Sequence, residues 1–469
     1  MSNGSKPNFL SGLTSGLGSK VRSRLATSAA DAATWASRKS GRGAGGMIGG
    51  LIAQKIDPRI MASLGKGRPA AIITGTNGKS TTTRMFAAAL RDAGQVVATN
   101  EGGDNMDAGV ISALLAEPKA DSIVLEVDEL HVAHIAQDLK PQVIVLLNLS
   151  RDQLDRVGEI NKIEATLRKA VNENPQATII ANCDDPLIAS AAWDAANVVW
   201  VSAGGGWTND ATSCPRTGGP IIRDGDNWYA VKKLDDGSTF SRPAPTWSIT
   251  DEGVKSPYGN VMPLNLTLPG NANRGNATLA IAGAVEMGAE ALTALNATEQ
   301  VDNVAGRYST VTVPGATQTR GGAEVIGAAG DKEVRMLLAK NPAGWQEALS
   351  MVDRTSDAVV IAVNGHVADG EDLSWLWDVK FEDFGDITVL ASGERGTDLS
   401  VRLLYAGIKH TLVADPLDAI RTCTDVDPSR PTRVEVLANY TAFRDLKKDI
   451  ERLNSDRVDT VRADSEETK

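Results

Sequence analysis

Short runs of apolar residues alternate along the first part of the chain with stretches whose apolar spacing suits helices. The first run, Ala70 to Ile73, ends at Thr74-Gly75, and a helical pattern then extends from Ser80 to Ala93. Three further apolar runs follow at 123–125, 143–147 and 178–181. Buried strands that alternate with helices are typical of a mostly parallel sheet covered on both faces. The pattern therefore predicts an α/β fold.

The pattern changes between Ser202 and Pro263, where Gly, Pro, Asp, Trp and Thr predominate. This composition predicts an insertion of short antiparallel strands and loops. A helical pattern resumes near Asn273. Beyond about residue 315 the apolar runs return, at 358–363, 387–390, 411–413 and 433–437. We therefore expect a second, Rossmann-like α/β domain.

These changes in pattern divide the chain into four segments. The expected boundaries are 1–65 for a leader with a short helical segment, 66–314 for a central domain with its insertion at about 202–263, 315–455 for a C-terminal α/β domain, and 456–469 for a flexible tail. The leader is rich in Ser, Gly and Ala, and the tail is charged with almost no large apolar residues. Such segments bury little apolar surface. Alternatively, the segment from Ala26 to Arg38 could form a helix whose alanines and Trp35 pack on a domain or a partner.

Composition narrows the functional classes. The 469 residues carry a net charge of −11, which argues against a general nucleic-acid binder. The sequence contains no apolar run long enough to cross a bilayer, and Phe9 to Leu13 is too short and polar for a signal peptide. Cys183, Cys214 and Cys423 are scattered and form no CxxC pair, which suits a reducing cytoplasm.

The most specific chemical signal lies between the first predicted strand and the helix that follows it. Glycines there allow backbone N–H groups to approach phosphate oxygens, the helix N-terminus adds partial positive charge, and a lysine can neutralise phosphate charge. The alternative is a strand–helix turn that binds nothing. The predicted loop residues are Gly75, Thr76, Asn77, Gly78, Lys79, Ser80 and Thr81.

A magnesium ion held by the Ser80 hydroxyl would need a carboxylate nearby. Glu126 follows the apolar run 123–125 and should lie at the same sheet edge as the loop. Asp128 and Glu129 are close alternatives.

The segment from Thr74 through Thr82 (TGTNGKSTT) resembles the ATP loop of the Mur ligases and folylpolyglutamate synthases. That resemblance implies a Mur ligase-like central P-loop ATPase domain and amide formation through an acyl-phosphate. Other segments resemble further motifs of this superfamily: Asn100-Glu101-Gly102 with Asn105-Met106, Asn148 through Gly158 (with Gln153 where His is usual), Asn182 through Pro186 (NCDDP), Gly270 through Asn276 (GNANRGN), and Gly306-Arg307.

The C-terminal half of the chain indicates which family within this superfamily the sequence resembles. A true Mur ligase carries Asp-Tyr-x-His-x-Pro where this chain has Leu338 through Gly344 (LAKNPAG). Together with Ala368 through Asp378 (ADGEDLSWLWD), this region resembles the MurT family, the synthetase subunits of lipid II isoglutaminyl synthase. The resemblance extends from about Ala33 to Tyr440. It implies ATP-dependent amidation of the D-glutamate α-carboxylate in the lipid II stem peptide, at the cytoplasmic face of the membrane.

The resemblance also implies roles for individual residues. Lys79 would hold phosphates, while Ser80 and Glu126 would hold Mg²⁺. Asn276 would orient nucleotide or metal-bound water. The remaining residues expected at the nucleotide are Asn182, Asp185 and Arg307.

The ammonia must come from elsewhere, because the chain has no cysteine nucleophile in a recognisable glutaminase context. The resemblance implies a heterodimer with a GatD-like glutamine amidotransferase, whose Cys–His pair is completed by an Asp of the synthetase. That Asp matches Asp372, with Asp369 as the alternative. By sequence alone, an Asp in such a loop is more often a turn former or a helix cap, and only the resemblance favours a catalytic role for Asp372.

Many MurT sequences insert a four-cysteine zinc ribbon in the central domain. Here Thr217 stands where the second cysteine would be, after Cys214, and the other pair is missing. We therefore expect no zinc, and an insertion held by Trp207, Trp228 and Tyr229. His131 and His134 share a helical spacing that could bind metal, although a surface role is the simpler interpretation.

Two other functions compete with this interpretation. An orthodox ligase would share the ATP loop but add an amino acid and work alone. A non-catalytic ATP-binding scaffold would bind the nucleotide without turning it over.

Overall fold

A computed structural model of the chain describes residues 19–39, 46–101, 104–151, 159–204, 210–302, 308–314, 318–320, 323–325, 330–384, 387–423 and 429–467. These residues form two compact units. Described residues up to Asp302 form unit 1, except that Arg151 groups with unit 2, which contains the described residues from Tyr308 onward.

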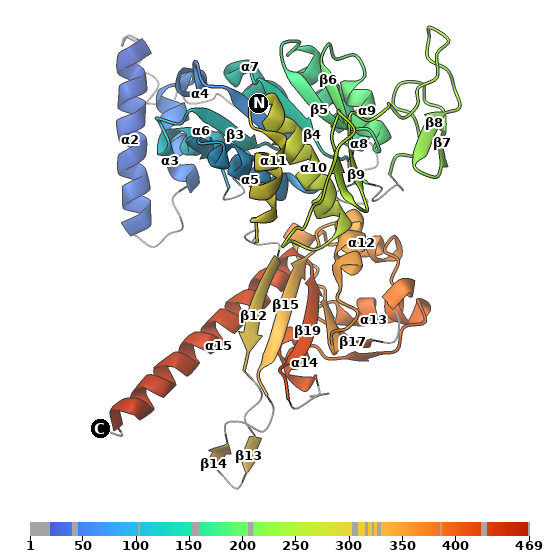
Figure 1. Cartoon of the computed structure of the whole chain (residues 1–469). Helices are drawn as coiled ribbons and strands as arrows, with labels where there is room; N and C mark the ends of the chain where they lie inside the picture. Colours follow the sequence, from blue (N-terminus) through green and yellow to red (C-terminus); the bar gives the residue numbers. More distant parts are fainter. Residues whose placement is uncertain are drawn as a thin grey trace, which may run out of the picture. The chain divides into compact units, whose positions relative to one another are not determined.

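Unit 1 is built around a nine-stranded sheet (Figure 1). Its sheet strands are β1 (Ala70–Thr74), β2 (Val97–Thr99), β3 (Ser122–Glu126), β4 (Val143–Leu146), β5 (Thr178–Asn182), β6 (Val198–Ser202), β9 (Trp247–Thr250), β10 (Gly253–Lys255) and β11 (Val261–Met262). Its helices are α2 (Ser19–Lys39), α3 (Gly46–Ile56), α4 (Ile60–Gly65), α5 (Lys79–Asp92), α6 (Asp107–Ala116), α7 (Val132–Leu139), α8 (Glu159–Asn172), α9 (Pro186–Ala192), α10 (Asn271–Glu286) and α11 (Ala291–Glu299).

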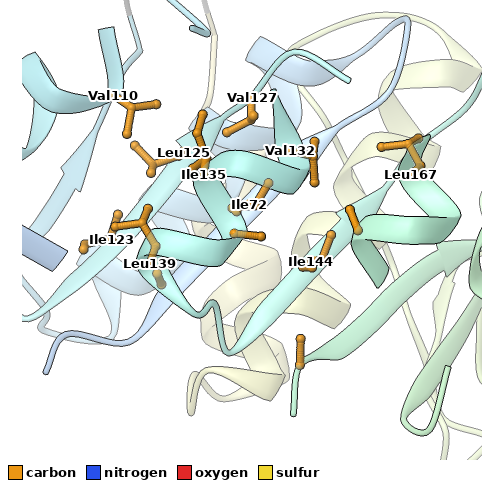
Figure 2. Packing of buried hydrophobic residues seen from close by; sticks show 14 of the residues in the cluster. Ile72, Val110, Ile123, Leu125, Val127, Val132, Ile135, Leu139, Ile144 and Leu167 are labelled. Carbon is orange, nitrogen blue, oxygen red and sulfur yellow. The ribbon is translucent and has the colours of Figure 1, made fainter. Parts of the chain in front are cut away.

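The strand order is β11-β10-β9-β6-β5-β4-β1-β3-β2, with parallel pairing from β2 through β9 and antiparallel pairing at the β10 and β11 edge. Every residue of β1, β3 and β4 is buried. Figure 2 shows side chains of α7, among them Ile135 and Leu139, gathered with Ile72 and Leu125 of the strands. The continuous burial confirms the predicted α/β fold, in which helices cover a mostly parallel sheet.

In the segment expected to be a leader with a short helix, the described residues form α2, α3 and α4, which pack on unit 1. Ala26 and Ala30 of α2 are buried in the same core as strand residue Ile72. A Cβ atom at Gly49 of α3 would lie 2.4 Å from Oγ1 of Thr34, so the two helices meet closely there. The Ser, Gly and Ala content that suggested disorder is also what allows helices to approach each other this closely.

Within the region expected to be an insertion, β9, β10 and β11 join the nine-stranded sheet, and residues 221–230 form a separate small hairpin with its own apolar cluster. Strands β7 (Ile221–Asp224) and β8 (Asn227–Ala230) pair antiparallel, as the composition predicted. Trp228 is fully buried and packs against Phe240, with ring centroids 5.0 Å apart. Cys214 is buried in the same cluster, whereas Tyr229 is exposed and Trp207 lies outside the described residues.

Unit 2 contains a six-stranded sheet in the order β12-β15-β19-β16-β17-β18. Only the β12–β15 pair is antiparallel. The elements are β12 (Tyr308–Val313), β13 (Gln318–Arg320), β14 (Ala323–Val325), β15 (Lys332–Leu338), α12 (Pro342–Met351), β16 (Ala358–Ala362), β17 (Thr388–Ser392), α13 (Gly396–Tyr405), β18 (His410–Leu412), α14 (Pro416–Thr422), β19 (Thr432–Ala438) and α15 (Tyr440–Glu467), with short 3-10 helices η1 (Val367–Asp369), η2 (Ser374–Trp377) and η3 (Glu382–Phe384).

The C-terminal segment differs from the expected tail. Helix α15 continues to Glu467, through the whole charged stretch from residue 456. Its first turns are anchored because Phe443, Leu446 and Ile450 are buried in the unit 2 core.

Candidate active site

The predicted phosphate loop joins β1 to the N-terminus of α5. Gly78 caps the helix with φ 87°, a left-handed conformation that favours glycine. Gly75 has φ 136°, and a Cβ atom there would lie 2.9 Å from the backbone oxygen of Asn148. The sequence therefore places glycine at the two loop positions where any side chain would be strained or would clash.

The loop is fastened to the segment that follows β4. Asn77 N–H donates to Oδ1 of Asn148 at 3.0 Å, and Asn148 Nδ2 returns a bond to the Asn77 carbonyl oxygen at 2.9 Å. Thr76 Oγ1 accepts from Ser150 N–H at 3.0 Å. These hydrogen bonds fix the loop backbone to the segment after β4. Neither Asn148 nor Ser150 was among the predicted site residues.

Lys79 is buried and turns back over its own loop. Its Nζ donates to the Gly75 carbonyl oxygen at 2.6 Å and pairs with Oε1 of Glu129 at 3.3 Å. The side chains of both partners are about nine-tenths buried. Glu129 therefore supplies the negative charge that balances Lys79. With Asp128, it is one of the two residues that the sequence left as alternatives to Glu126 for the carboxylate near the loop.

Glu126 occupies the place expected for a metal ligand. It ends β3, the strand next to β1, and is in register with Ile73. Asn100 clamps its backbone by accepting from its N–H and donating to its carbonyl oxygen, each at 2.8 Å. Asn105 donates to Oε1 at 3.3 Å, but Oε2 is buried without a hydrogen-bond partner. A buried carboxylate oxygen left without a partner is costly, and binding a cation at that oxygen would remove the cost.

The remaining predicted loop residues line the start of α5. Ser80 is half-buried and Thr81 is buried in its first turn. Asn276, from α10, is buried against the loop: a Cβ atom at Gly78 would lie 2.5 Å from its Oδ1. The GNANRGN motif at the start of α10 thus places the side-chain amide of Asn276 beside the phosphate loop, although the two segments lie about 200 residues apart in the sequence. Arg307, also predicted, lies outside the described residues.

Asn182 and Asp185 shape this region through the backbone. Asn182 Nδ2 donates to the Leu147 carbonyl oxygen at 2.9 Å. Asp185 caps α9 by accepting from Leu187 N–H, and its other oxygen accepts from Leu149 N–H at 2.7 Å. Burial raises the pKa of the Asp185 carboxyl to about 6. Both side chains are therefore committed to holding the loops after β4 and β5 together.

Asp184, between those residues, anchors the insertion. Arg242 donates to Oδ1 of Asp184 from Nε at 2.8 Å and from Nη2 at 2.7 Å. Trp228 Nε1 donates to the Cys183 carbonyl oxygen at 2.9 Å. Burial raises the pKa of the Cys183 thiol to about 12, which makes it a poor nucleophile at neutral pH.

In unit 2 the two alternative aspartates have different environments. Asp369 is buried and accepts hydrogen bonds from the backbone N–H of Thr441, at 2.9 Å, and from its hydroxyl. Asp372 is exposed, and its Oδ1 accepts from Ser374 N–H at 2.8 Å. Asp369 therefore secures the start of α15, while Asp372 presents its carboxylate to solvent.

His131 and His134, for which a surface role is the simpler interpretation, both lie beside Asp107. His131 Nδ1 lies 3.0 Å from Oδ1 of Asp107, and His134 Nε2 lies 3.4 Å from Oδ2 of the same residue. Within the described ranges, no group of three or more His, Cys, Asp or Glu residues is placed to hold a metal. None of the helices in the described part of the chain combines the length and apolar character that crossing a bilayer requires.

Comparison with known proteins agrees with this geometry. The Mur ligase middle domain family matches residues 73–284, and the MurT ligase C-terminal family matches residues 338–443. The subunit MurT of lipid II isoglutaminyl synthase (glutamine-hydrolyzing) from Streptococcus pneumoniae is 27% identical over 84% of this chain and 90% of its own length. Its Staphylococcus aureus counterpart is 26% identical over 85% of this chain and 91% of its own.

Among solved structures, a pseudomurein peptide ligase type C from Methanothermus fervidus has a TM-score of 0.61 and 16% identity, covering 86% of this chain and 81% of that one. The fold and the phosphate loop together define a Mur ligase-like protein. Within that class, the chain is similar to MurT proteins: its C-terminal region matches the MurT ligase C-terminal family, and the two MurT relatives resemble it over 84% and 85% of its length.

Proposed function

We propose that this protein is the synthetase subunit of a lipid II isoglutaminyl synthase. It would amidate the α-carboxylate of D-glutamate in the lipid II stem peptide, using ATP and ammonia from a partner glutaminase. The observation that carries this proposal is the combination in one chain of a Mur-type phosphate loop and an exposed Asp372 in the MurT-specific region. Full-length relatives with that activity in their names match both units.

The chemistry requires activation because a carboxylate does not react with ammonia at neutral pH. The γ-phosphoryl group of ATP is transferred to a carboxylate oxygen, and ADP leaves. The ammonia lone pair then attacks the carbonyl carbon, the bond to the phosphate oxygen breaks, and phosphate departs while nitrogen loses a proton. The protein contributes positioning and charge stabilisation to both steps.

Each residue of the loop has a role in that scheme. The Thr76 and Asn77 N–H groups are bonded to Asn148, so the backbone N–H groups at the N-terminus of α5, from Gly78 to Ser80, would bind the phosphates. Lys79 would exchange Glu129 for phosphate oxygens. Ser80 and Glu126 would hold Mg²⁺, which neutralises phosphate charge when bound. The unpartnered Oε2 of Glu126 fits that task. Asn276, in contact with Gly78, orients the nucleotide, and Asn182 and Asp185 shape its pocket.

The ammonia supply is proposed to depend on a second subunit. Asp372 would accept a hydrogen bond from the catalytic histidine of a GatD-like glutaminase in a heterodimer. Apolar residues flank Asp372 at a short distance in sequence: Val367 is 79% exposed and Trp377 is 55% exposed. Trp377 also packs edge-on against Tyr405 of α13, with centroids 5.3 Å apart. Large exposed apolar groups around a solvent-facing carboxylate suit a protein interface.

The proposed function places the protein at the cytoplasmic face of the membrane, where its substrate is made available. The test is ATP-dependent amidation of lipid II by the purified chain, supplied with ammonium or glutamine, with and without the glutaminase. We expect activity with ammonium alone, and with glutamine only when the partner is present. Amidation in no condition, with ATP still bound, would support a non-catalytic scaffold, and incorporation of an amino acid would support an orthodox ligase.

A further inference from the structure

Helices α2 and α3 carry large apolar side chains on their solvent side. Helix α2 lies beside α3 at the edge of unit 1 (Figure 1). It is docked through Ala26 and Ala30, which are buried, and through Ser23, whose hydroxyl donates to Oδ2 of Asp57 at 2.6 Å. One side of α2 is thereby committed to the fold, and the other side faces solvent.

The solvent side of α2 has a helical spacing of apolar and basic residues. Val21 and Leu25 are 49% and 47% exposed, and Arg24 and Ser28 are exposed between and beyond them. Positions 21, 24, 25 and 28 are separated by three, four and seven residues, so they share one face. Helix α3 adds exposed Met47, Ile48 and Leu51.

The charge of these two helices opposes that of the rest of the chain. Helix α2 contains five basic residues and one acidic residue, and the only charged residue of α3 is Lys55. The helices therefore carry +5 within a chain of net charge −11, which leaves −16 on the remainder. An anionic surface would attract this part of unit 1 and repel the rest, so charge alone would orient the molecule.

We propose that α2 and the exposed side of α3 dock the protein peripherally on a bilayer rich in anionic phospholipids. Arg24 would contact head groups, while Val21, Leu25 and the α3 side chains enter the interface without spanning it. A second copy of this chain is a poor occupant, since it would bring the same positive charge. The proposal complements the proposed function, because a lipid-linked substrate is presented at such a surface, but it concerns lipid binding alone.

The test is sedimentation of the full chain with vesicles that contain no lipid II. Phosphatidylcholine vesicles are compared with vesicles of phosphatidylcholine mixed with phosphatidylglycerol, at low and high salt. We expect binding only to the anionic vesicles, weakening as salt rises. Arg24→Glu should reduce the affinity roughly tenfold, and the double change Val21→Asp and Leu25→Asp should reduce it at least as much.

Matched controls use equally accessible positions elsewhere in unit 1. Lys169→Glu on α8 makes the same charge change, and Leu292→Asp on α11 makes the same apolar-to-acidic change. Both should bind vesicles like the wild type, and all variants should keep the wild-type melting temperature and ATP affinity. Equal binding to neutral vesicles, no binding, or equal losses in the control variants would overturn the proposal. So would a doubled mass in solution that Leu25→Asp returns to a monomer, which would identify a second copy as the occupant.

Discussion

Nζ of Lys79 lies 3.3 Å from Oε1 of Glu129, and both side chains are buried at the phosphate loop. The lysine also donates to the carbonyl oxygen of Gly75, within its own loop. A buried cation must be compensated, and Glu129 supplies that compensation when no phosphate is present. A nucleotide that bound through Lys79, as proposed, would therefore have to compete with the Glu129 carboxylate for this side chain.

That competition gives the first prediction. Glu129→Gln should tighten ATP binding measured without Mg²⁺ by roughly fivefold, because an amide holds Lys79 less strongly than a carboxylate does. Isothermal titration calorimetry measures the change. Lys79→Ala serves as the reference variant: it should keep the fold, lose amidation and weaken ATP binding. Weaker ATP binding in Glu129→Gln would instead show that Glu129 supports the nucleotide directly, and retained amidation in Lys79→Ala would remove the loop from the mechanism.

The second prediction separates the two aspartates of unit 2. Asp372→Asn should impair amidation driven by glutamine and spare amidation driven by added ammonium, since its exposed carboxylate is proposed to serve only the glutaminase. Asp369→Asn should instead lower the melting temperature, because Asp369 accepts two hydrogen bonds from Thr441 at the start of α15. Activities with the two nitrogen sources and thermal unfolding provide the readouts. Equal loss with both nitrogen sources in Asp372→Asn would assign that residue to structure or to the synthetase site.

The third prediction concerns pH. Burial raises the pKa of the Asp185 carboxyl to about 6 from its ordinary 3.8, so between those values the folded state binds more protons than the unfolded state. The contribution of Asp185 to stability therefore increases as pH falls, by about 1 kcal/mol between roughly pH 7 and pH 5. Asp185→Asn removes this titration. Urea unfolding of both proteins should show the wild type gaining that amount relative to the variant; a constant difference between them would contradict the raised pKa.

The fourth prediction concerns the insertion. Its stability should come from the packing of Trp228 and Phe240 rather than from bound zinc. A chelator should leave the melting temperature unchanged, and elemental analysis should detect no stoichiometric zinc. Trp228→Ala should cost about 3–5 kcal/mol, since it removes a fully buried ring and its hydrogen bond to the Cys183 carbonyl. Stoichiometric zinc, or unfolding by the chelator, would overturn this account.

The sequence by itself determined the α/β class, because short apolar runs separated by helical spacing have few other stable arrangements. It also determined the position of the phosphate loop, because Gly75 and Gly78 occupy the backbone conformations that favour glycine. These features depend on local spacing and backbone freedom, which are read directly from neighbouring residues.

Tertiary structure decided which distant side chains meet. Only the fold brings Asn276 against Gly78. The fold also pairs Lys79 with Glu129 rather than with Glu126. In unit 2 it buries Asp369 and leaves Asp372 exposed. The alanines of α2 could have packed on a domain or on a partner, and only the fold places Ala26 and Ala30 in the core of unit 1. In each case several partners are compatible with the spacing, and the choice depends on burial and on competition for hydrogen bonds, which exist only once the chain has folded.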